Sequence, residues 1–379
     1  MFLTESIPDH LADIEVVMLH KKGCKEDPKN YRGISLINTM LKLYTSMILK
    51  RLEKWVDNAN ILPEAQAGFR KKRGCVDHIF TIDSLRKIFH SKRRKRKLHM
   101  LYVDFARAFD SVPHKKLWEK LNNIGVSPKI IRILSDMYAK ARMKIRTKSG
   151  STRCYDVTEG VLQGELTSPL LFSIYISDID DAFKQLETLG IRGINIKHNV
   201  AIHVLAYADD LVILADCPTH LQAKLDKLSI YCAENGLKVN VAKTKILIFH
   251  NRHPSNPAKS KFIYNNEEIE IVPKFTYLGV TFCECGKFHK HVKNIKTKCA
   301  AATEAIISII PKSKNVSWDA IQKLKNSHLM SIPGYAIEIY GAYYPKEIEA
   351  IQLSFLKRIL HLPRCTPGYM LRLKQGPVI

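Results

Sequence analysis

Short apolar runs alternate with amphipathic segments along most of the chain. The run "LHMLYVDF", residues 98–105, consists of strand-forming residues and predicts a buried strand that ends at Asp104. Two further apolar runs enclose a pair of aspartates in "VLAYADDLVIL", residues 204–214. They predict two short strands joined by a tight turn at Ala208-Asp209.

The same pattern predicts elements on both sides of these strands. Apolar residues at helical spacing, with proline near the start and glycine at the end, indicate helices. Alternating runs bounded by Gly, Asn or Ser indicate strands. The expected elements are helices at 112–125, 168–183 and 219–236, a hairpin within 143–158, strands at 245–249 and 262–282, and a mainly helical region from about 287 that is interrupted at Pro333-Gly334.

The charge of the chain narrows the choice of partner. Its 379 residues include 60 Lys+Arg against 36 Asp+Glu, a net charge of +24. Such an excess favours a polyanion as partner, although membrane surfaces are also anionic and some basic proteins bind neither. The longest apolar candidate for a membrane span, 201–215, is broken by the two aspartates. We therefore expect a soluble protein that does not bind membranes.

The cysteines and one basic run indicate in which cellular compartment the protein is expected. Nine cysteines are scattered without a CxxC pair, which fits a reducing compartment, so we expect the protein in the nucleus, the cytoplasm or both. The run "SKRRKRK", 91–97, is interpreted as a solvated loop that contacts phosphates loosely; a nuclear-import signal is the alternative.

The aspartate pair requires an explanation, because adjacent carboxylates repel each other and are costly to bury. A divalent cation bound by both would remove that cost. Asp104 ends a separate apolar strand and would supply a third carboxylate if that strand lies beside the 204–214 hairpin. Three carboxylates on one rim suit metal-assisted phosphoryl transfer. The alternative is a pair of ordinary turn residues.

Seven blocks of sequence, in order, resemble reverse transcriptases of the non-LTR (LINE-like) retrotransposon class. Five resemble the palm motifs, and two upstream blocks resemble the fingers motifs. The palm-like blocks are "LYVDFARAFDSV", "GVLQGELTSPLLF", "AYADDLVIL", "GLKVNVAKTKIL" and "FTYLGVTF"; the fingers-like blocks are "KKGCKEDPKNYRGISLINTMLKLYTSMILKRL" and "QAGFRKKRGCVDHI". The region from "IPGYAIEIYG" to "LKRILHLP" is similar to the part that follows the thumb in this class.

The resemblance implies an α+β fold of the right-hand polymerase type. It places the fingers at 1–97, the palm at 98–286 with a fingers-side insertion at about 112–158, and a helical thumb with a C-terminal extension at 287–379. It also implies an RNA-directed DNA polymerase that uses Mg²⁺, with Mn²⁺ as the alternative ion, and that binds an RNA template, a DNA primer and dNTPs. We expect the chain to be the polymerase segment of such an element, without its nuclease module.

The resemblance assigns roles at the carboxylate rim. Asp104, Asp209 and Asp210 match the metal-binding triad, with Asp210 expected to be the weakest ligand, and Phe105 would offer a backbone carbonyl to one metal. Lys243 matches the lysine proposed to protonate the leaving pyrophosphate, while Lys245 is expected to point the other way.

The nucleotide site is assigned in the same way. Lys21 and Arg32 match residues that contact the triphosphate. Lys22 is an alternative to Lys21 in this role. The other interpretation is that these are surface-exposed basic residues without such a contact. Phe109 matches the aromatic gate that excludes a ribose 2′-OH; its alternative is a core residue packed on Phe105. Gln163 and Gly164 match the block that lines the incoming nucleotide.

The remaining assignments concern template and primer. Arg70 and Lys71 are expected near template phosphates and Tyr207 near the nucleic acid. Tyr277, Leu278 and Gly279 resemble the primer-grip hairpin, although any tight hairpin uses such residues.

Two positions depart from the family pattern. Leu162 replaces a basic residue, and Glu165 is expected to bring a negative charge near the triphosphate. A catalytically weak or inactive, nucleic-acid-binding relic is therefore the second hypothesis. An RNA-directed RNA polymerase is the third, and Phe109 disfavours it.

Overall fold

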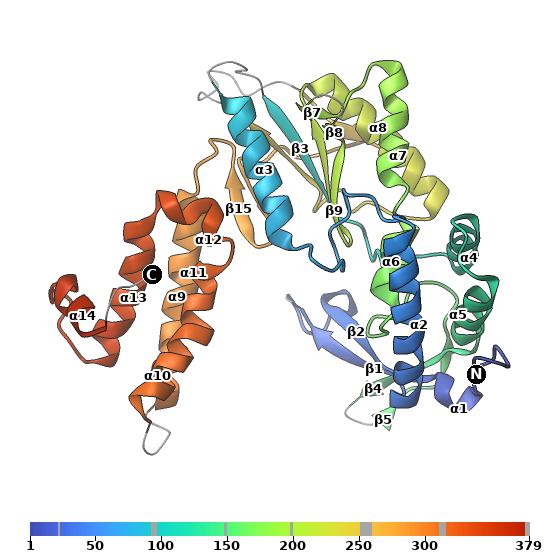
Figure 1. Cartoon of the computed structure of the whole chain (residues 1–379), viewed down its shortest axis with the longest axis horizontal. Helices are drawn as coiled ribbons and strands as arrows, with labels where there is room; N and C mark the ends of the chain where they lie inside the picture. The colour runs from blue at the N-terminus through green and yellow to red at the C-terminus, as the bar shows by residue number, and fades with distance from the viewer. Residues whose placement is uncertain are drawn as a thin grey trace. The chain divides into compact units, whose positions relative to one another are not determined.

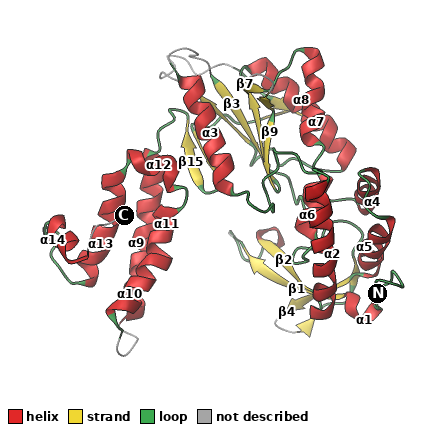
Figure 2. Cartoon of the chain, in the orientation of Figure 1, coloured by secondary structure: helices red, strands yellow, loops and turns green. Residues whose placement is uncertain are grey.

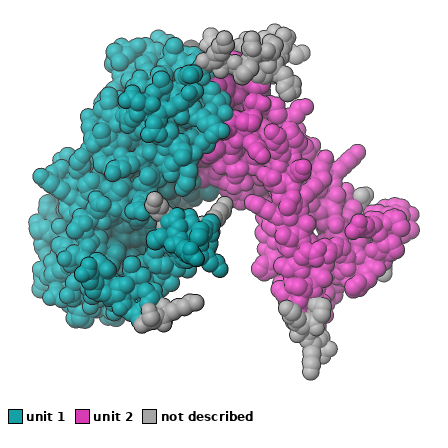
Figure 3. Space-filling model, turned by 180° about the vertical axis from the view of Figure 1, so that it is seen from behind, with its two compact units in different colours: residues 1–75, 98–246, 256–271 teal, residues 76–97, 247–255, 272–379 magenta. Residues whose placement is uncertain are grey.

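A computed structural model gives the structure of the chain in two compact units, which Figure 3 distinguishes by colour. Unit 1 comprises 1–75, 98–246 and 256–271, and unit 2 comprises 76–97, 247–255 and 272–379. The structure describes residues 1–21, 23–91, 97–147, 150–197, 200–250, 260–310 and 316–375. Lys22, Ser149 and most of the basic run 91–97 therefore lie outside the described residues.

The sheet that carries the aspartates has the strand order β11-β3-β10-β9, and β3, β9 and β10 belong to unit 1. Its strands are β3 (Leu98–Val103), β9 (Val204–Tyr207), β10 (Asp210–Ala215) and β11 (Lys245–Phe249). All six residues of β3 are buried, as the apolar run predicts. β10 is antiparallel to β3, with Leu211 opposite Val103, and antiparallel to β9, with Asp210 opposite Tyr207. The three strands predicted around the aspartates are thus confirmed.

Helices pack against this sheet, and further helices form much of the rest of unit 1 (Figures 1 and 2). α8 packs on β10 and β3, and its end at Gly236 (φ +66°) agrees with the predicted stop. The helix predicted over 168–183 is divided by residues 176–178 into two helices. The helices are α1 (Asp9–Ala12), α2 (Thr39–Asn58), α4 (His114–Asn123), α5 (Pro128–Lys140), α6 (Ser168–Tyr175), α7 (Ile179–Lys184) and α8 (Pro218–Asn235), with 3-10 turns η1 (Pro28–Asn30) and η2 (Gln185–Leu189).

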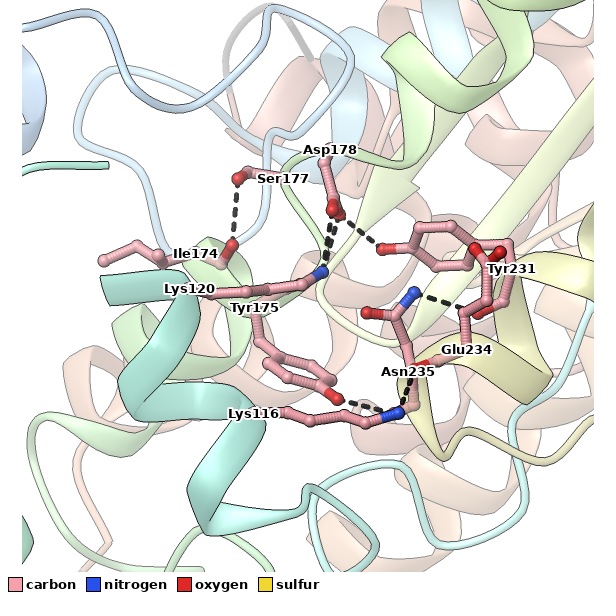
Figure 4. A network of polar contacts seen from close by, with 9 residues as sticks. All are labelled: Lys116, Lys120, Ile174, Tyr175, Ser177, Asp178, Tyr231, Glu234 and Asn235. Atoms are coloured by element: carbon pink, nitrogen blue, oxygen red, sulfur yellow. Dashed lines mark hydrogen bonds and ion pairs between the residues drawn. The ribbon is translucent and has the colours of Figure 1, made fainter. Parts of the chain in front are cut away.

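A polar network joins three of these helices (Figure 4). The ammonium of Lys120 on α4 lies 2.8 Å from both carboxylate oxygens of Asp178 and donates to the carbonyl of Tyr175 at 2.7 Å. Tyr231 on α8 donates to the same carboxylate at 2.6 Å. Burial lowers the pKa of Lys120, while Asp178 opposes that shift. One carboxylate therefore fixes α4 and α8 to the end of α6.

A second sheet of unit 1 has the order β2-β1-β4-β5, with β6 also paired to β4. β1 and β2 are antiparallel, with Leu19 opposite Arg32, and β1 and β4 are parallel. The hairpin predicted within 143–158 is present as β4, β5 and β6. The strands of this sheet and the short remaining ones are β1 (Asp13–His20), β2 (Tyr31–Leu36), β4 (Arg142–Thr147), β5 (Gly150–Ser151), β6 (Tyr155–Asp156), β7 (Ile194–Lys197), β8 (Val200–Ile202), β12 (Ile263–Tyr264) and β13 (Glu267–Glu268).

Unit 2 combines one hairpin with helices. α9 packs against β15 and α13. The predicted interruption near Pro333 is present, because α11 ends at Gly334 and Ala336 adopts φ +53°. The elements are α3 (Cys75–His90), β14 (Lys274–Tyr277), β15 (Val280–Cys283), α9 (His289–Ile309), α10 (Trp318–Leu324), a π-helical turn η4 (Lys325–Met330), α11 (Ser331–Gly334), α12 (Ile337–Tyr340), η5 (Gly341–Tyr343), α13 (Pro345–Ile359) and α14 (Gly368–Gln375).

The two units divide the chain differently from the predicted fingers, palm and thumb, so that three-part division stays a prediction. None of the helices within the described ranges combines the length and apolar character needed to cross a bilayer.

Candidate active site

The sheet brings the three predicted aspartates to one edge. Asp104 directly follows β3, Asp210 begins β10, and Asp209 occupies the turn between β9 and β10. Because β3 and β10 are antiparallel neighbours with Val103 opposite Leu211, the end of one strand meets the start of the other. The proposed convergence of the three carboxylates on one rim therefore follows from the strand pairing.

The carboxylates influence one another electrostatically. Burial, followed by the charges of Asp209 and Asp104, raises the pKa of Asp210 to about 6. Burial is also the main cause that raises the pKa of Asp209; Asp104 adds to it, and the cations Arg32 and Lys21 oppose it. Clustered oxygen ligands whose charges repel are what a hard divalent cation stabilises, so these residues fit Mg²⁺ or Mn²⁺.

The rim is not a closed metal cage. Within the described ranges, one group of potential ligand atoms lies within 4.8 Å of one another, and it is Asp216, Cys217 and His220 at the start of α8. The oxygens of the aspartate triad are therefore more widely spaced. Asp209 and Asp210 are neighbours across a tight turn, which agrees with the expectation that they do not serve a metal equally.

The segment after α8 holds Asp104 in place. The backbone N–H of Asp104 donates to Thr244 Oγ1 at 3.2 Å, and its carbonyl accepts from Asn240 N at 2.8 Å. Lys243 Nζ lies 3.7 Å from Asp104 Oδ2, whereas Lys245 pairs with Glu270 at 2.7 Å. The preference for Lys243 over Lys245 thus agrees with the geometry.

The carbonyl of Phe105 stays outside this pairing. Phe105 forms an isolated antiparallel bridge with Val239, made by Ala106 N donating to Lys238 O and by Asn240 N donating to Asp104 O. The hydrogen bonds belong to the peptide groups on either side of Phe105. This arrangement is compatible with its predicted role as a metal ligand.

Lys21 and Arg32, the two basic residues predicted to contact the triphosphate, are close enough to the aspartates to affect their pKa values. Lys21 follows β1, and Arg32 is on the paired strand β2. Both lower the pKa of Asp209 and also that of Asp110. Because β1 and β2 are antiparallel, with His20 opposite Tyr31, Lys21 and Arg32 lie at the same end of this strand pair.

Phe109 stacks on Phe172 of α6, with ring centroids 4.5 Å apart. The residue is half-buried. This position is compatible with the gate and also with a core residue, so the choice between the two roles of Phe109 stays a prediction.

Asp110 is a site residue that the sequence analysis missed. Gln163 Nε2 donates to Asp110 Oδ1 at 3.0 Å, which fixes the amide of the predicted nucleotide-lining residue. Burial of the carboxylate raises the pKa of Asp110, although much of the residue is exposed. A second aspartate six positions after Asp104 was the available signal.

Gly164 is required for the contact between its loop and β2. It adopts φ +120°, and a Cβ there would lie 2.5 Å from the carbonyl oxygen of Ser35. Ser35 N donates to Gln163 O at 2.7 Å. A larger residue would separate Gln163 from the second sheet.

Glu165 is buried at the start of α6. The residue is 3% exposed, and its carboxylate accepts hydrogen bonds from the N–H and the hydroxyl of Thr167. Negative charge is stabilising at a helix N-terminus. The effect of this charge on an incoming triphosphate stays a prediction.

The basic residues predicted to contact template already bind protein groups. Arg70 donates to the carbonyls of Pro63 and Gln66, and Lys71 pairs with Glu53 at 2.7 Å. The template role of Arg70 and Lys71 stays a prediction.

Tyr207, next to the aspartate turn, is half-buried. Its hydrogen bond with Cys75 raises the pKa of Tyr207 to about 12, so the hydroxyl stays protonated at neutral pH. Its contact with nucleic acid stays a prediction.

The predicted primer-grip residues lie in unit 2. Leu278 and Gly279 form the two-residue turn of the β14–β15 hairpin, both with positive φ. Tyr335 donates to the carbonyl of Leu278 at 2.8 Å, and a Cβ at Gly279 would lie 3.1 Å from the Tyr335 ring. Tyr277 is buried in this hairpin and lies 3.4 Å from His78 Nδ1 through its hydroxyl. Contact of these residues with the primer stays a prediction.

The raised pKa of Asp210 predicts how stability depends on pH in metal-free buffer. A folded-state pKa of about 6, above the value of ~3.9 in the unfolded chain, means that the native state binds more protons between these values. The contribution to stability is present below about pH 4 and is lost as pH rises through 6. Neighbouring groups shield the carboxylate of Asp210 from water, but much of the residue is exposed, and solvent screens its charge. We therefore expect a contribution of at most about 1 kcal/mol.

The measurement is the free energy of unfolding of wild type and Asp210→Asn, with EDTA, from pH 4.5 to 7.5. Asp210→Asn should flatten this part of the profile and be the more stable protein at pH 7.5. Parallel profiles for the two proteins would show that Asp210 titrates normally.

Comparisons with known proteins agree with this geometry. Residues 19–282 match the family described as "Reverse transcriptase (RNA-dependent DNA polymerase)". The chain is 24% identical over 347 residues to a probable RNA-directed DNA polymerase from transposon BS of Drosophila melanogaster, covering 89% of this chain and 37% of that protein. It is also 24% identical to a Pol polyprotein from a type-1 retrotransposable element R2 of Popillia japonica, covering 98% of this chain and 51% of that protein. The chain thus spans about half or less of these relatives.

Solved structures support the fold alone. Telomerase from Candida albicans, in complex with a fragment of telomeric RNA, superposes with a TM-score of 0.58 at 12% identity, covering 99% of this chain and 68% of that one. The predicted right-hand polymerase fold is confirmed by this similarity together with the family match. The carboxylate rim, the order of the motifs and the similarity over most of the chain lead to one conclusion: this protein belongs to the reverse transcriptase family and is of the non-LTR retrotransposon type.

Proposed function

We propose that the chain is an RNA-directed DNA polymerase that extends a DNA primer 3′-OH with dNTPs on an RNA template. The observation that carries the proposal is the composition of one rim in unit 1. Asp104 directly follows β3, and Asp209 lies in the turn that precedes the neighbouring strand β10. Lys243 lies 3.7 Å from Asp104, and Arg32 and Lys21 lower the pKa of Asp209. Nucleotidyl transfer requires carboxylates that bind metal ions and, next to them, basic side chains that bind the phosphates.

Asp104 and Asp209 would hold the divalent ions, with Asp210 and the Phe105 carbonyl in supporting roles. When bound, two such ions lower the pKa of the attacking hydroxyl and neutralise charge on the phosphate oxygens. The hard oxygen ligands of the rim favour Mg²⁺, with Mn²⁺ as a substitute.

The cations of the rim would orient and neutralise the triphosphate. Arg32 offers a planar fork of donors, and Lys21 offers a mobile point charge. Lys243 would donate the proton that the leaving pyrophosphate takes up, and its ion pair with Asp104 keeps it at the rim before nucleotide binds.

Nucleotide and primer would be selected by neighbouring groups. Gln163, with its amide fixed by Asp110, and Gly164, on its close approach to Ser35, would line the nucleotide. The exposed part of the Phe109 ring would exclude a ribose 2′-OH. Tyr207 would contact the nucleic acid near the rim.

The nucleic-acid path would use further residues. Arg70 and Lys71 would approach the template backbone, and the turn of Tyr277, Leu278 and Gly279 would support the primer. The net charge of +24 favours such a polyanion.

The triad test separates an enzyme from a binding relic. Asp104→Asn and Asp209→Asn keep the size of the side chain and remove the charge that holds a cation. Each should reduce extension of oligo(dT) on poly(rA) about a thousandfold or more, because charge stabilisation of a phosphoryl transition state amounts to several kcal/mol. The double variant should be little worse than either single one, since the two groups act as a unit.

Asp226→Asn is the matched control. Asp226 lies on α8, accepts a hydrogen bond from Gln222, and belongs to none of the motif blocks. It should extend at the wild-type rate. Extension by Asp209→Asn at the wild-type rate would contradict the proposal; primer–template binding without extension by any protein, wild type included, would identify a relic.

The gate test concerns sugar selection. Phe109→Val removes the ring and should raise ribonucleotide incorporation relative to deoxynucleotide about five- to hundredfold, the scale of one lost steric exclusion. Phe183→Val, at a buried position on α7, is the control that loses a core ring without changing selection. An unchanged ratio in Phe109→Val, with lowered stability, would assign Phe109 to the core.

A further inference from the structure

Gln66 connects the loop after α2 to the turn that carries the aspartate pair. Its side chain is 2% exposed, and its Oε1 accepts two backbone hydrogen bonds. One comes from Gly68 N at 2.9 Å and the other, from 142 residues away, comes from Ala208 N at 3.1 Å. A buried amide that receives a turn N–H fixes the position of that peptide group.

The turn needs such support. Ala208 adopts φ +56°, whereas Asp209 is not among the residues with positive φ. In two-residue hairpins this pattern belongs to the type II′ turn, whose first central position is usually glycine. An alanine in that conformation is disfavoured relative to glycine, so surrounding contacts must hold it.

The loop that carries Gln66 is itself held on the hairpin. Gln66 forms a parallel bridge with Ala206, in which Ala206 N donates to Ala65 O at 2.8 Å and Ala67 N donates to Ala206 O at 2.9 Å. Arg70 donates to the backbone carbonyl of Gln66 at 3.1 Å. The amide of Gln66 therefore sits on a fixed backbone.

The backbone of the loop that carries Gln66 lies so close to the turn at Ala208 that position 68 requires glycine. A Cβ at Gly68 would lie 2.3 Å from the nitrogen of Ala208. Loop and turn are in direct backbone contact, and Gln66 supplies the acceptor at that contact.

We propose that Gln66 is a positioning residue, which accepts the Ala208 N–H and thereby sets the place of the Asp209 carboxylate at the metal rim. The inference rests on the proposed function, and it adds a residue that touches neither metal nor substrate. Loss of the acceptor would let the Tyr207-Ala208 peptide group rotate and would shift the turn that carries Asp209. Metal binding and the chemical step would weaken, while nucleotide binding at Lys21 and Arg32 is retained.

The test compares three variants of the full chain. Gln66→Met has a similar length and no strong acceptor. Gln66→Glu keeps an acceptor oxygen for both N–H groups. Gln352→Met removes a buried glutamine from α13 in unit 2 and controls for general loss of stability.

The first measurement is amide hydrogen exchange of the segment 204–214, which needs no activity. In Gln66→Met the turn should exchange at least tenfold faster than in wild type, and in Gln66→Glu and Gln352→Met it should stay protected. Unchanged exchange in Gln66→Met would overturn the proposed contact.

The second measurement separates positioning from mere structural support. In Gln66→Met we expect kcat for primer extension to fall ten- to a hundredfold, the KM for dTTP to change less than twofold, and the Mn²⁺ concentration for half of the metal-induced rise in Tm to increase several-fold. Gln66→Glu should lose less activity, and Gln352→Met should lose none.

Faster exchange with wild-type kcat and an unchanged Mn²⁺ midpoint would overturn the positioning role and leave the proposed function intact. A wild-type chain that neither extends primers nor shows a Mn²⁺-induced rise in Tm would overturn the proposed function, and the positioning role of Gln66 with it.

Discussion

Repulsion among the carboxylates of Asp104, Asp209 and Asp210 is the constraint on which the rest of unit 1 depends. The sheet places these charges on one edge, and burial together with mutual repulsion raises the pKa of Asp210 to about 6. A chain retains such an arrangement when other groups hold each carboxylate in place. Thr244 and Asn240 bind the backbone of Asp104, and Gln66 binds the turn before Asp209. Repulsion among the three carboxylates destabilises the folded state, and the hydrogen bonds to Asp104 and to the turn before Asp209 oppose this effect.

The strands and helices of unit 1 could be predicted from sequence because their signals are local. The apolar run of β3, the paired runs of β9 and β10, and the Asn-Gly end of α8 each appear within about twenty residues, and the structure confirms them. The family could also be identified from sequence, because each motif is a short local stretch and the motifs follow one another in a fixed order. The division into fingers, palm and thumb needs contacts between distant segments and stays a prediction.

Residues whose contacts depend on distant partners could not be predicted from local sequence. Asp110 contacts Gln163, 53 positions away, and Gln66 contacts Ala208, 142 positions away. The hydrogen bonds of Glu165 to Thr167 at the start of α6 could not be predicted from its place in the motif either. Sequence pattern identifies which residues are near a site, whereas hydrogen bonds decide which way they point.

Asp104 and Asp209 are proposed to form one divalent-metal site together. Anomalous diffraction at the manganese edge, from crystals of the chain soaked in Mn²⁺, tests this site. We expect anomalous peaks at the rim, with carboxylate oxygens of both Asp104 and Asp209 as ligands. An empty rim, with manganese at Asp216, Cys217 and His220 or at no protein site, would contradict it.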